Sequence, residues 1–254
     1  MNYYIDTEFL EGKQKESFPI SLFRKKTKPT IDLISIGIVS EDGREYYAVS
    51  KDFNLKEAWN RFDLKVNKLP RHNPGVKSDV LRARNEAGFS KVYWIRDNVL
   101  KPIFDELLKN HKYNWSFTYT NLKYLIDLHG KTNKQIAEEI KRFVYAPEQV
   151  RPMGTEEPIN FYAYYAGYDW VAFCWLFGKM IDLPKGFPMY CIDLKQMMDN
   201  KALIYDDDKY SKLNLESKIK YLKTNSNYPK QANEHNALAD ARWNKELHKF
   251  LNKI

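Results

Sequence analysis

The chain opens with an apolar strand that leads directly into two acidic residues. Tyr3 to Ile5 is followed by Asp6, Thr7 and Glu8. Alternate residues of a strand point to the same face, so the pattern predicts that the carboxylates of Asp6 and Glu8 project together. Such close carboxylates repel each other unless a cation lies between them, and Mg²⁺ or Mn²⁺ prefers oxygen ligands of this kind. A strand that ends in a polar turn and exposes both acids is the other interpretation.

The composition is that of a soluble globular protein with a basic surface. The 254 residues carry a formal net charge of +8, which favours a polyanionic partner or substrate. A generally basic surface without a polyanion is the alternative. The two cysteines, Cys174 and Cys191, make neither a disulfide framework nor a zinc site. The N-terminus has no signal-peptide pattern, and the longest apolar run is too short to span a bilayer. We therefore expect a cytoplasmic protein that has no membrane partner.

Hydrophobic periodicity predicts an alternating series of strands and helices. Three strands in the first 50 residues, with an Asp42-Gly43 turn between the second and third, predict an antiparallel meander. The expected strands are 3–9, 31–39, 45–49 and 159–165, and the expected helices are 55–62, 94–109, 132–145, 170–176, 213–222 and 236–251. Residues 63–88 look irregular, and 113–130 fits neither pattern. No linker divides the chain, so residues 1–254 are expected to form one α/β domain.

Three more polar residues stand at the ends of predicted elements. Asp169 lies where a strand passes into a helix, shortly after Gly167, which we expect to provide an unusual backbone turn. Asp240 lies one turn into the last helix, and His235 precedes it by five residues. Taken singly, Asp169 is typical of a helix cap, Asp240 of a solvated helix position, and His235 of a cap or surface imidazole.

Taken together, these residues resemble the motifs of a nuclease superfamily. The stretch from His235 to Ala241 is similar to the third motif of the DEDDh exonucleases, in the RNase T-like (DnaQ-like) superfamily. Asp6-Thr7-Glu8 resembles their first motif and Tyr168-Asp169 their second, while Asn236 replaces the tyrosine of the sister subgroup. The resemblance implies an RNase H-like mixed sheet flanked by helices, the DnaQ-like exonuclease fold. We expect this chain to form a single domain of that fold, with insertions at about 11–30 and 63–130.

A closer resemblance is to RNase AS, the adenylate-specific exoribonuclease family. It rests on Asp6 to Phe9, on residues 33–37 and 41–50, and on His235 to Arg242. That family is shorter, and the two insertions lie outside the resemblance. The resemblance favours single-stranded RNA over DNA as the partner, with a preference for adenylate-rich 3′ ends, and it admits a homodimer.

The expected reaction is metal-dependent 3′→5′ hydrolysis that releases nucleoside 5′-monophosphates. Two Mg²⁺ or Mn²⁺ ions can activate a water molecule and stabilise the leaving 3′-oxygen. We assign Asp6 as the bridging ligand, Glu8 and Asp240 to the ion that carries the attacking water, and Asp169 to the second ion. His235 takes the proton from that water, as an imidazole can at neutral pH.

Substrate contacts are less constrained by the sequence. Phe9 and Trp170 either stack on bases or pack in the core. The basic run Arg24, Lys25 and Lys26 either tracks phosphates or is a solvated loop. Two alternative functions stay open, which are a 3′→5′ DNA exonuclease and a non-catalytic nucleic-acid-binding module with an exonuclease fold.

Overall fold

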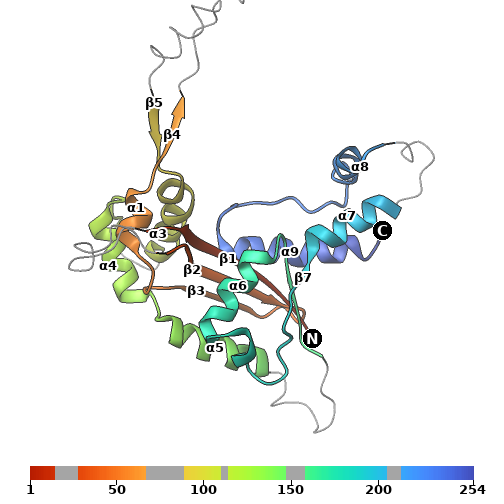
Figure 1. The fold of residues 1–254 in the computed structure, drawn as a ribbon, viewed down its shortest axis with the longest axis horizontal. Helices are drawn as coiled ribbons and strands as arrows, with labels where there is room; N and C mark the ends of the chain where they lie inside the picture. Colours follow the sequence, from red (N-terminus) through yellow and green to blue (C-terminus); the bar gives the residue numbers. More distant parts are fainter. Residues whose placement is uncertain (15–27, 67–88, 110–113, 147–157, 205–212) are drawn as a thin grey trace, which may run out of the picture.

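A five-stranded mixed sheet forms the centre of the molecule (Figure 1). The computed structural model describes residues 1–14, 28–66, 89–109, 114–146, 158–204 and 213–254. The strand order is β3-β2-β1-β6-β7, and β1 is antiparallel to β2 but parallel to β6. The strands are β1 Asn2–Gly12, β2 Thr30–Ser40, β3 Glu45–Val49, β6 Asn160–Ala163 and β7 Ile192–Asp193.

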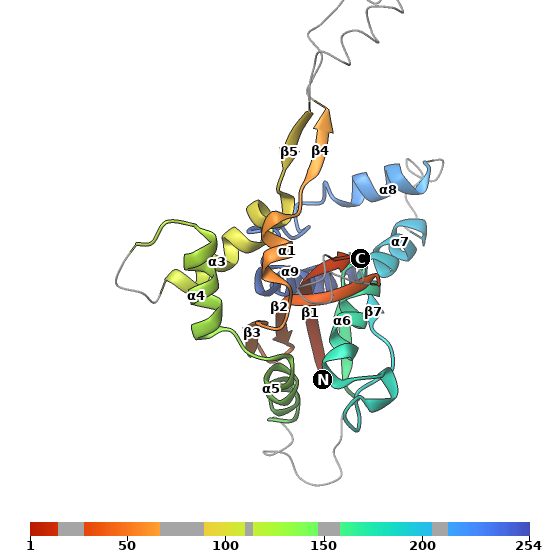
Figure 2. The ribbon, with the colours of Figure 1, turned by 60° about the vertical axis from the view of Figure 1, so that its left-hand side comes forward.

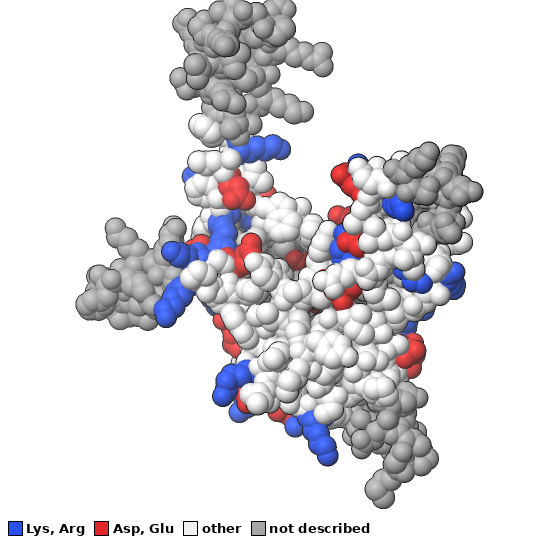
Figure 3. Space-filling view, turned by 45° about the vertical axis from the view of Figure 1, so that its right-hand side comes forward, with Lys and Arg blue, Asp and Glu red and all other residues white. Residues whose placement is uncertain are grey.

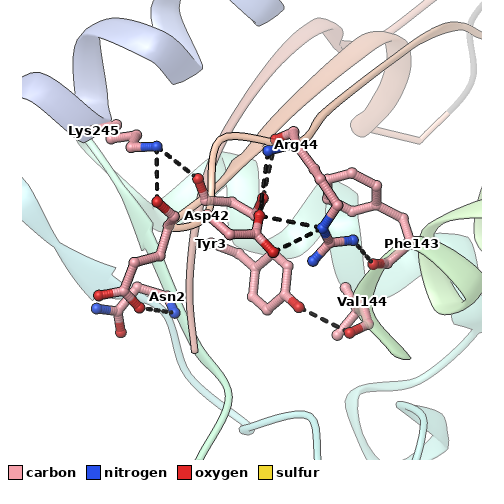
Figure 4. Close-up of polar contacts among 9 residues, drawn as sticks. Asn2, Tyr3, Asp42, Arg44, Phe143, Val144 and Lys245 are labelled. Atoms are coloured by element: carbon pink, nitrogen blue, oxygen red, sulfur yellow. Dashed lines mark hydrogen bonds and ion pairs between the residues drawn. The ribbon is translucent and has the colours of Figure 1, made fainter. Parts of the chain in front are cut away.

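The predicted meander of the first three strands is confirmed. Gly43 takes a φ of 92° in the turn between β2 and β3, a conformation that favours glycine. The Arg44 side chain pairs with Asp42 at 2.9 Å and donates to the Phe143 carbonyl, and Lys245 donates to two carbonyls of the same turn (Figure 4). The turn therefore holds helices from both faces of the sheet.

The two faces of the sheet are covered by different helices (Figures 1 and 2). On one face Tyr3 and Ile5 pack with α5 Asn133–Tyr145 and α6 Gly167–Phe177. On the other face Tyr4 packs with α7 Leu194–Ile204, α8 Leu215–Leu222 and α9 Ala237–Leu251. Alternate residues of β1 therefore serve two separate cores, as the period of a strand requires.

A third group of helices packs around the end of β1 and β2. These are α1 Leu55–Asn60, a π-helical turn Arg96–Leu100, α3 Lys101–Leu108 and α4 Tyr119–His129. The predicted helix 94–109 is confirmed in place, although its first half is π-helical. Thr118 caps α4 by accepting from the Asn121 N–H at 3.2 Å, so the unassigned stretch 113–130 contains a helix.

A two-stranded ribbon stands apart from the main sheet. It pairs β4 Asp63–Val66 with β5 Phe89–Val92, and Figure 2 shows it projecting from the molecule. The expectation that all of 63–88 is irregular is therefore wrong at its start. Leu64 and Lys91, which face each other across the ribbon, are both exposed, so no alternation of buried and exposed residues marks these strands.

Two further details differ from the sequence predictions. The unusual backbone conformation before α6 belongs to Tyr165, with a φ of 58°, and not to Gly167. β7 and α7 also had no sequence signal that we recognised. In the described part of the chain, no helix has the length and apolar character that a bilayer crossing needs. The order and directions of the five strands fit an RNase H-like fold.

Candidate metal centre and active site

Asp6 and Glu8 lie on the face of β1 that α9 covers. Tyr4, two residues before Asp6, belongs to the core beneath α9, and alternation places the two acids on the same face. The Asn244 side chain of α9 donates to the Ile5 carbonyl at 2.9 Å and so ties the helix to this strand. The two acids therefore point toward the N-terminal part of α9.

A glycine allows α9 to approach the strand this closely. Gly37 of β2 is the register partner of Asp6. A Cβ atom built on Gly37 would lie 2.3 Å from the Ala237 carbonyl oxygen, within the first turn of α9. Asn236 caps that turn by accepting from the Ala239 N–H at 3.0 Å. This close approach brings Asp240, the first acidic residue of α9, to the two carboxylates of β1.

The segment before α9 holds Asp240 from two sides. The His235 backbone N–H donates to Asp240 Oδ2 at 2.9 Å, and Gln231 Nε2 donates to Oδ1 at 2.7 Å. His235 has a φ of 67°, in the left-handed region that few residues other than glycine adopt. The Trp94 ring and the imidazole pack edge to face, with ring centroids 4.8 Å apart. His235 is therefore held beside Asp240 by backbone and side-chain contacts.

Asp169 reaches the site from the first turn of α6. The Tyr4–Tyr162 pair of the parallel strands β1 and β6 places the end of β6 level with Asp6. Asp169 Oδ1 accepts from the Thr7 N–H at 2.8 Å and from Thr7 Oγ1 at 2.7 Å. Only 6% of the Asp169 surface is exposed. Thr7, which lies between Asp6 and Glu8 in β1, therefore holds the carboxylate of Asp169 in place.

The four predicted metal ligands and His235 all line one cavity of about 710 Å³. Figure 3 shows the surface hollowed between the β4–β5 ribbon and the part that carries α8, with acidic side chains visible inside. Arg61 is the only lysine or arginine among the described residues that line the cavity, and it pairs with Glu57 at 3.3 Å. The carboxylates of the site therefore have no cationic side chain of their own among these residues.

Crowding of these acids changes their protonation. Burial, followed by the charges of Asp169, Glu8 and Asp240, raises the pKa of Asp6 well above its ordinary value. Burial and then the charges of Asp240 and Asp169 raise the pKa of Glu8 to about 8. Burial raises the pKa of Asp169 to about 6, against the hydrogen bonds from Thr7. Burial also raises the pKa of Asp240. Full ionisation of all four carboxylates is therefore unfavourable without a cation.

This donor set fits a divalent cation. Asp6, Glu8 and Asp240 each offer a carboxylate oxygen, and the three oxygens lie within 4.8 Å of one another. An ion between them would stabilise the charged carboxylates against their burial and, for Asp6 and Glu8, against the charges of neighbouring acids. Hard oxygen donors suit Mg²⁺ or Mn²⁺. Asp169 is not part of this group of three, but its charge is the first among those that act on Asp6. Asp169 and Asp6 line the same cavity.

The expected substrate contacts have different outcomes. Phe9 lines the cavity and packs against Tyr168, with ring centroids 5.5 Å apart. Trp170 instead stacks on Phe173 in the core, where its indole donates to the Met189 carbonyl, so we leave it out of the site. Arg24, Lys25 and Lys26 lie outside the described residues.

Sequence reasoning missed other residues that shape the cavity. Thr7 and Gln231 hold the carboxylates of Asp169 and Asp240, and Trp94 packs on His235. The only available signal was for Thr7, which stands between the two acids of the first strand. Gln231 comes from a polar loop that has no periodic pattern. Trp94 begins the predicted helix 94–109, where the pattern marks burial and not a site.

Comparison with known proteins finds relatives that are named as nucleases. By sequence, the chain is similar to 3′–5′ exoribonucleases. Two such enzymes, from two strains of Mycobacterium tuberculosis, are each 27% identical to it over 205 residues. The match covers 80% of this chain and 76% of each relative. No family model matches the sequence.

Proposed function

We propose that this protein is a metal-dependent 3′→5′ exoribonuclease of the DEDDh type, with a DnaQ-like exonuclease fold. The convergence of Asp6, Glu8 and Asp240 within 4.8 Å, in one cavity with Asp169 and His235, carries the proposal. The relatives named 3′–5′ exoribonuclease support the same reaction class. Cytoplasmic location and homodimerisation stay predictions from the sequence.

Each carboxylate has a defined part in this reaction. Asp6, Glu8 and Asp240 would hold one Mg²⁺ or Mn²⁺ ion, and Asp6 and Asp169 would hold the second. Two such ions, when bound, supply positive charge for the phosphodiester and for the leaving oxygen. Thr7 and Gln231 keep Asp169 and Asp240 in place through their hydrogen bonds. The ligands therefore do not have to reorganise during turnover.

His235 would act as the general base. Its imidazole accepts the proton of the water that attacks the phosphorus, and the P–O3′ bond breaks as the new P–O bond forms. The 3′-oxygen leaves and takes up a proton from solvent to become a hydroxyl, so the products are a nucleoside 5′-monophosphate and an RNA shortened by one nucleotide. The hydrogen bond from the His235 backbone to Asp240 keeps this base next to a ligand of the proposed metal site.

We further propose that the enzyme prefers adenylate-rich 3′ ends, as the resemblance to RNase AS implies. The cavity offers aromatic side chains for the terminal base, among them Phe9 and Tyr168. Flat aromatic rings stack on any base, so these residues explain affinity more readily than base choice. Rates on RNAs that differ only in the last nucleotide would test the preference.

The proposed activity is tested with end-labelled oligonucleotides. Matched RNA and DNA strands, with free and blocked 3′ ends, are incubated with Mg²⁺ or with EDTA. We expect a ladder of products from RNA only, which a 3′ block or EDTA abolishes. Cleavage of DNA at an equal rate would identify a DNA exonuclease, and binding without cleavage would identify a non-catalytic module.

A further inference from the structure

A second cavity, of about 770 Å³, lies beside the metal centre and has no part in the reaction outlined above. It is formed by the end of α8 and the segment 223–234, which leads from α8 to α9 (Figure 1). Gln231 lines both cavities, and its amide donates to Asp240 at 2.7 Å. We call this second cavity the lysine groove, because Lys223 and Lys230 line it.

The lysine groove offers donors suited to phosphate and ribose oxygens. Neither Lys223 nor Lys230 forms an ion pair with a carboxylate of the described residues, and Glu234 is the only described acid in the lining. Thr224, Asn225 and Ser226 follow Lys223 in the lining and add hydroxyl and amide groups between the two lysines. Cations and small polar groups of this kind contact a nucleic-acid backbone without reading its bases.

Contacts with α9 fix the groove relative to the metal centre. Tyr228 packs its ring against Phe250, with centroids 5.4 Å apart, so it is turned into the core. The Trp243 indole donates to the Pro229 carbonyl at 3.1 Å, one turn beyond Asp240. The same helix therefore carries a proposed metal ligand and anchors the groove, and the two sites keep a fixed spacing.

We propose that the lysine groove binds the sugar–phosphate backbone of the RNA strand, on the 5′ side of the nucleotide at the metal centre. The inference rests on the proposed function, because it takes the terminal nucleotide to lie in the first cavity. Charge complementarity and continuity through Gln231 make the body of the substrate the occupant. The groove then adds affinity for long strands whatever their sequence.

Binding is tested with the full-length chain carrying Asp6→Asn, so that the strand is not consumed. The probes are 5′-fluorescein oligoadenylate and oligouridylate of about 12 nucleotides. Lys223→Gln/Lys230→Gln should weaken binding of both roughly tenfold, and the plot of log K against log salt should become shallower by about 1.4. Lys134→Gln/Lys141→Gln, on exposed positions of α5, removes the same charge away from the groove and should have little effect.

Turnover gives a second readout that separates the two proposals. With the active-site residues intact, the groove variant should hydrolyse a dinucleotide at the wild-type rate but show a roughly tenfold higher KM for the long strand. Equal binding of the long strand by variant and wild type would overturn the groove. So would a loss that differs between oligoadenylate and oligouridylate. A wild-type protein that hydrolyses neither substrate refutes the proposed function, whereas the binding result still decides the groove.

Discussion

Gly37 and Ala237, which lie 200 positions apart in the chain, touch backbone to backbone. A Cβ atom on Gly37 would come within 2.3 Å of the Ala237 carbonyl oxygen, a distance that side-chain rotation cannot relieve. This contact seats the first turn of α9 directly over the register partner of Asp6. The distance between Asp6 and Asp240 therefore depends on the absence of one methyl group.

Gly37→Ala should displace α9 and move Asp240 away from Asp6 and Glu8. We expect a loss of about 3 kcal/mol in the free energy of unfolding and nuclease activity near background. Urea titration and RNA hydrolysis measure the two effects. Gly167→Ala is the matched control, since a Cβ there has no atom within 4 Å and the site is helical. Wild-type activity in Gly37→Ala would refute the role given to this contact.

Asp6→Asn should stabilise the protein without metal while it abolishes turnover. The substitution removes a carboxyl whose ionisation burial and the neighbouring acids oppose, so we expect a gain of roughly 1–3 kcal/mol in the free energy of unfolding in EDTA. Mg²⁺ should raise the melting temperature of the wild type and leave that of the variant nearly unchanged. Thermal denaturation with and without Mg²⁺ checks both statements. A variant less stable than the wild type in EDTA would contradict the mutual repulsion.

Trp94→Ala should lower kcat about tenfold with little change in KM, because the ring positions the imidazole of His235. Trp94→Phe keeps an aromatic edge and should restore most of the rate. Single-turnover kinetics on a dinucleotide separate this positioning role from base stacking. A rise in KM alone would assign Trp94 to substrate binding instead.

His248 should make the fold less stable at mildly acidic pH. Its ring nitrogens lie 2.8 Å from the Tyr4 hydroxyl and 3.1 Å from Asn252 Nδ2, and burial lowers its pKa. The unfolded chain therefore binds the proton more readily, and stability falls as pH drops through about 6.5, the value for an unfolded histidine. We expect a loss of about 1 kcal/mol by pH 5.5.

The comparison that isolates this effect is between the wild type and His248→Gln. The difference in unfolding free energy between the two proteins should narrow as pH falls from 7.5 to 5.5, because glutamine does not titrate. Urea titrations across that range measure it. A difference independent of pH would show that His248 is not the group responsible.

The regular elements of the fold were predictable where one face of a strand or helix is buried. β3 begins and ends at the predicted residues, and α5 begins one residue after the predicted start, Thr132, which caps it. The β4–β5 ribbon has no buried face, and β7 is two residues long, so neither leaves a periodic pattern. Hydrophobic periodicity marks only elements that bury one face, so elements without a buried face are not predicted from it.

The candidate site was predictable for the residues that the resemblance covers. Asp6, Glu8, Asp169, His235 and Asp240 all line one cavity, as expected. Two tryptophans could not be placed from the sequence. Trp170, expected as a base contact or a core residue, lies in the core, and Trp94 packs on His235. A lone aromatic residue carries no signal that separates packing from a site, and only the tertiary contacts make the distinction.

The central claim, that the acids of β1, α6 and α9 form a metal centre, is tested most directly by counting bound ions. Mn²⁺ binding to the full-length wild-type protein and to Asp6→Asn can be followed by electron paramagnetic resonance, with a nucleoside 5′-monophosphate present. We predict two Mn²⁺ ions per wild-type chain and a loss of tight binding in the variant. A wild-type protein that binds no Mn²⁺, or a variant that binds it equally well, would contradict this account.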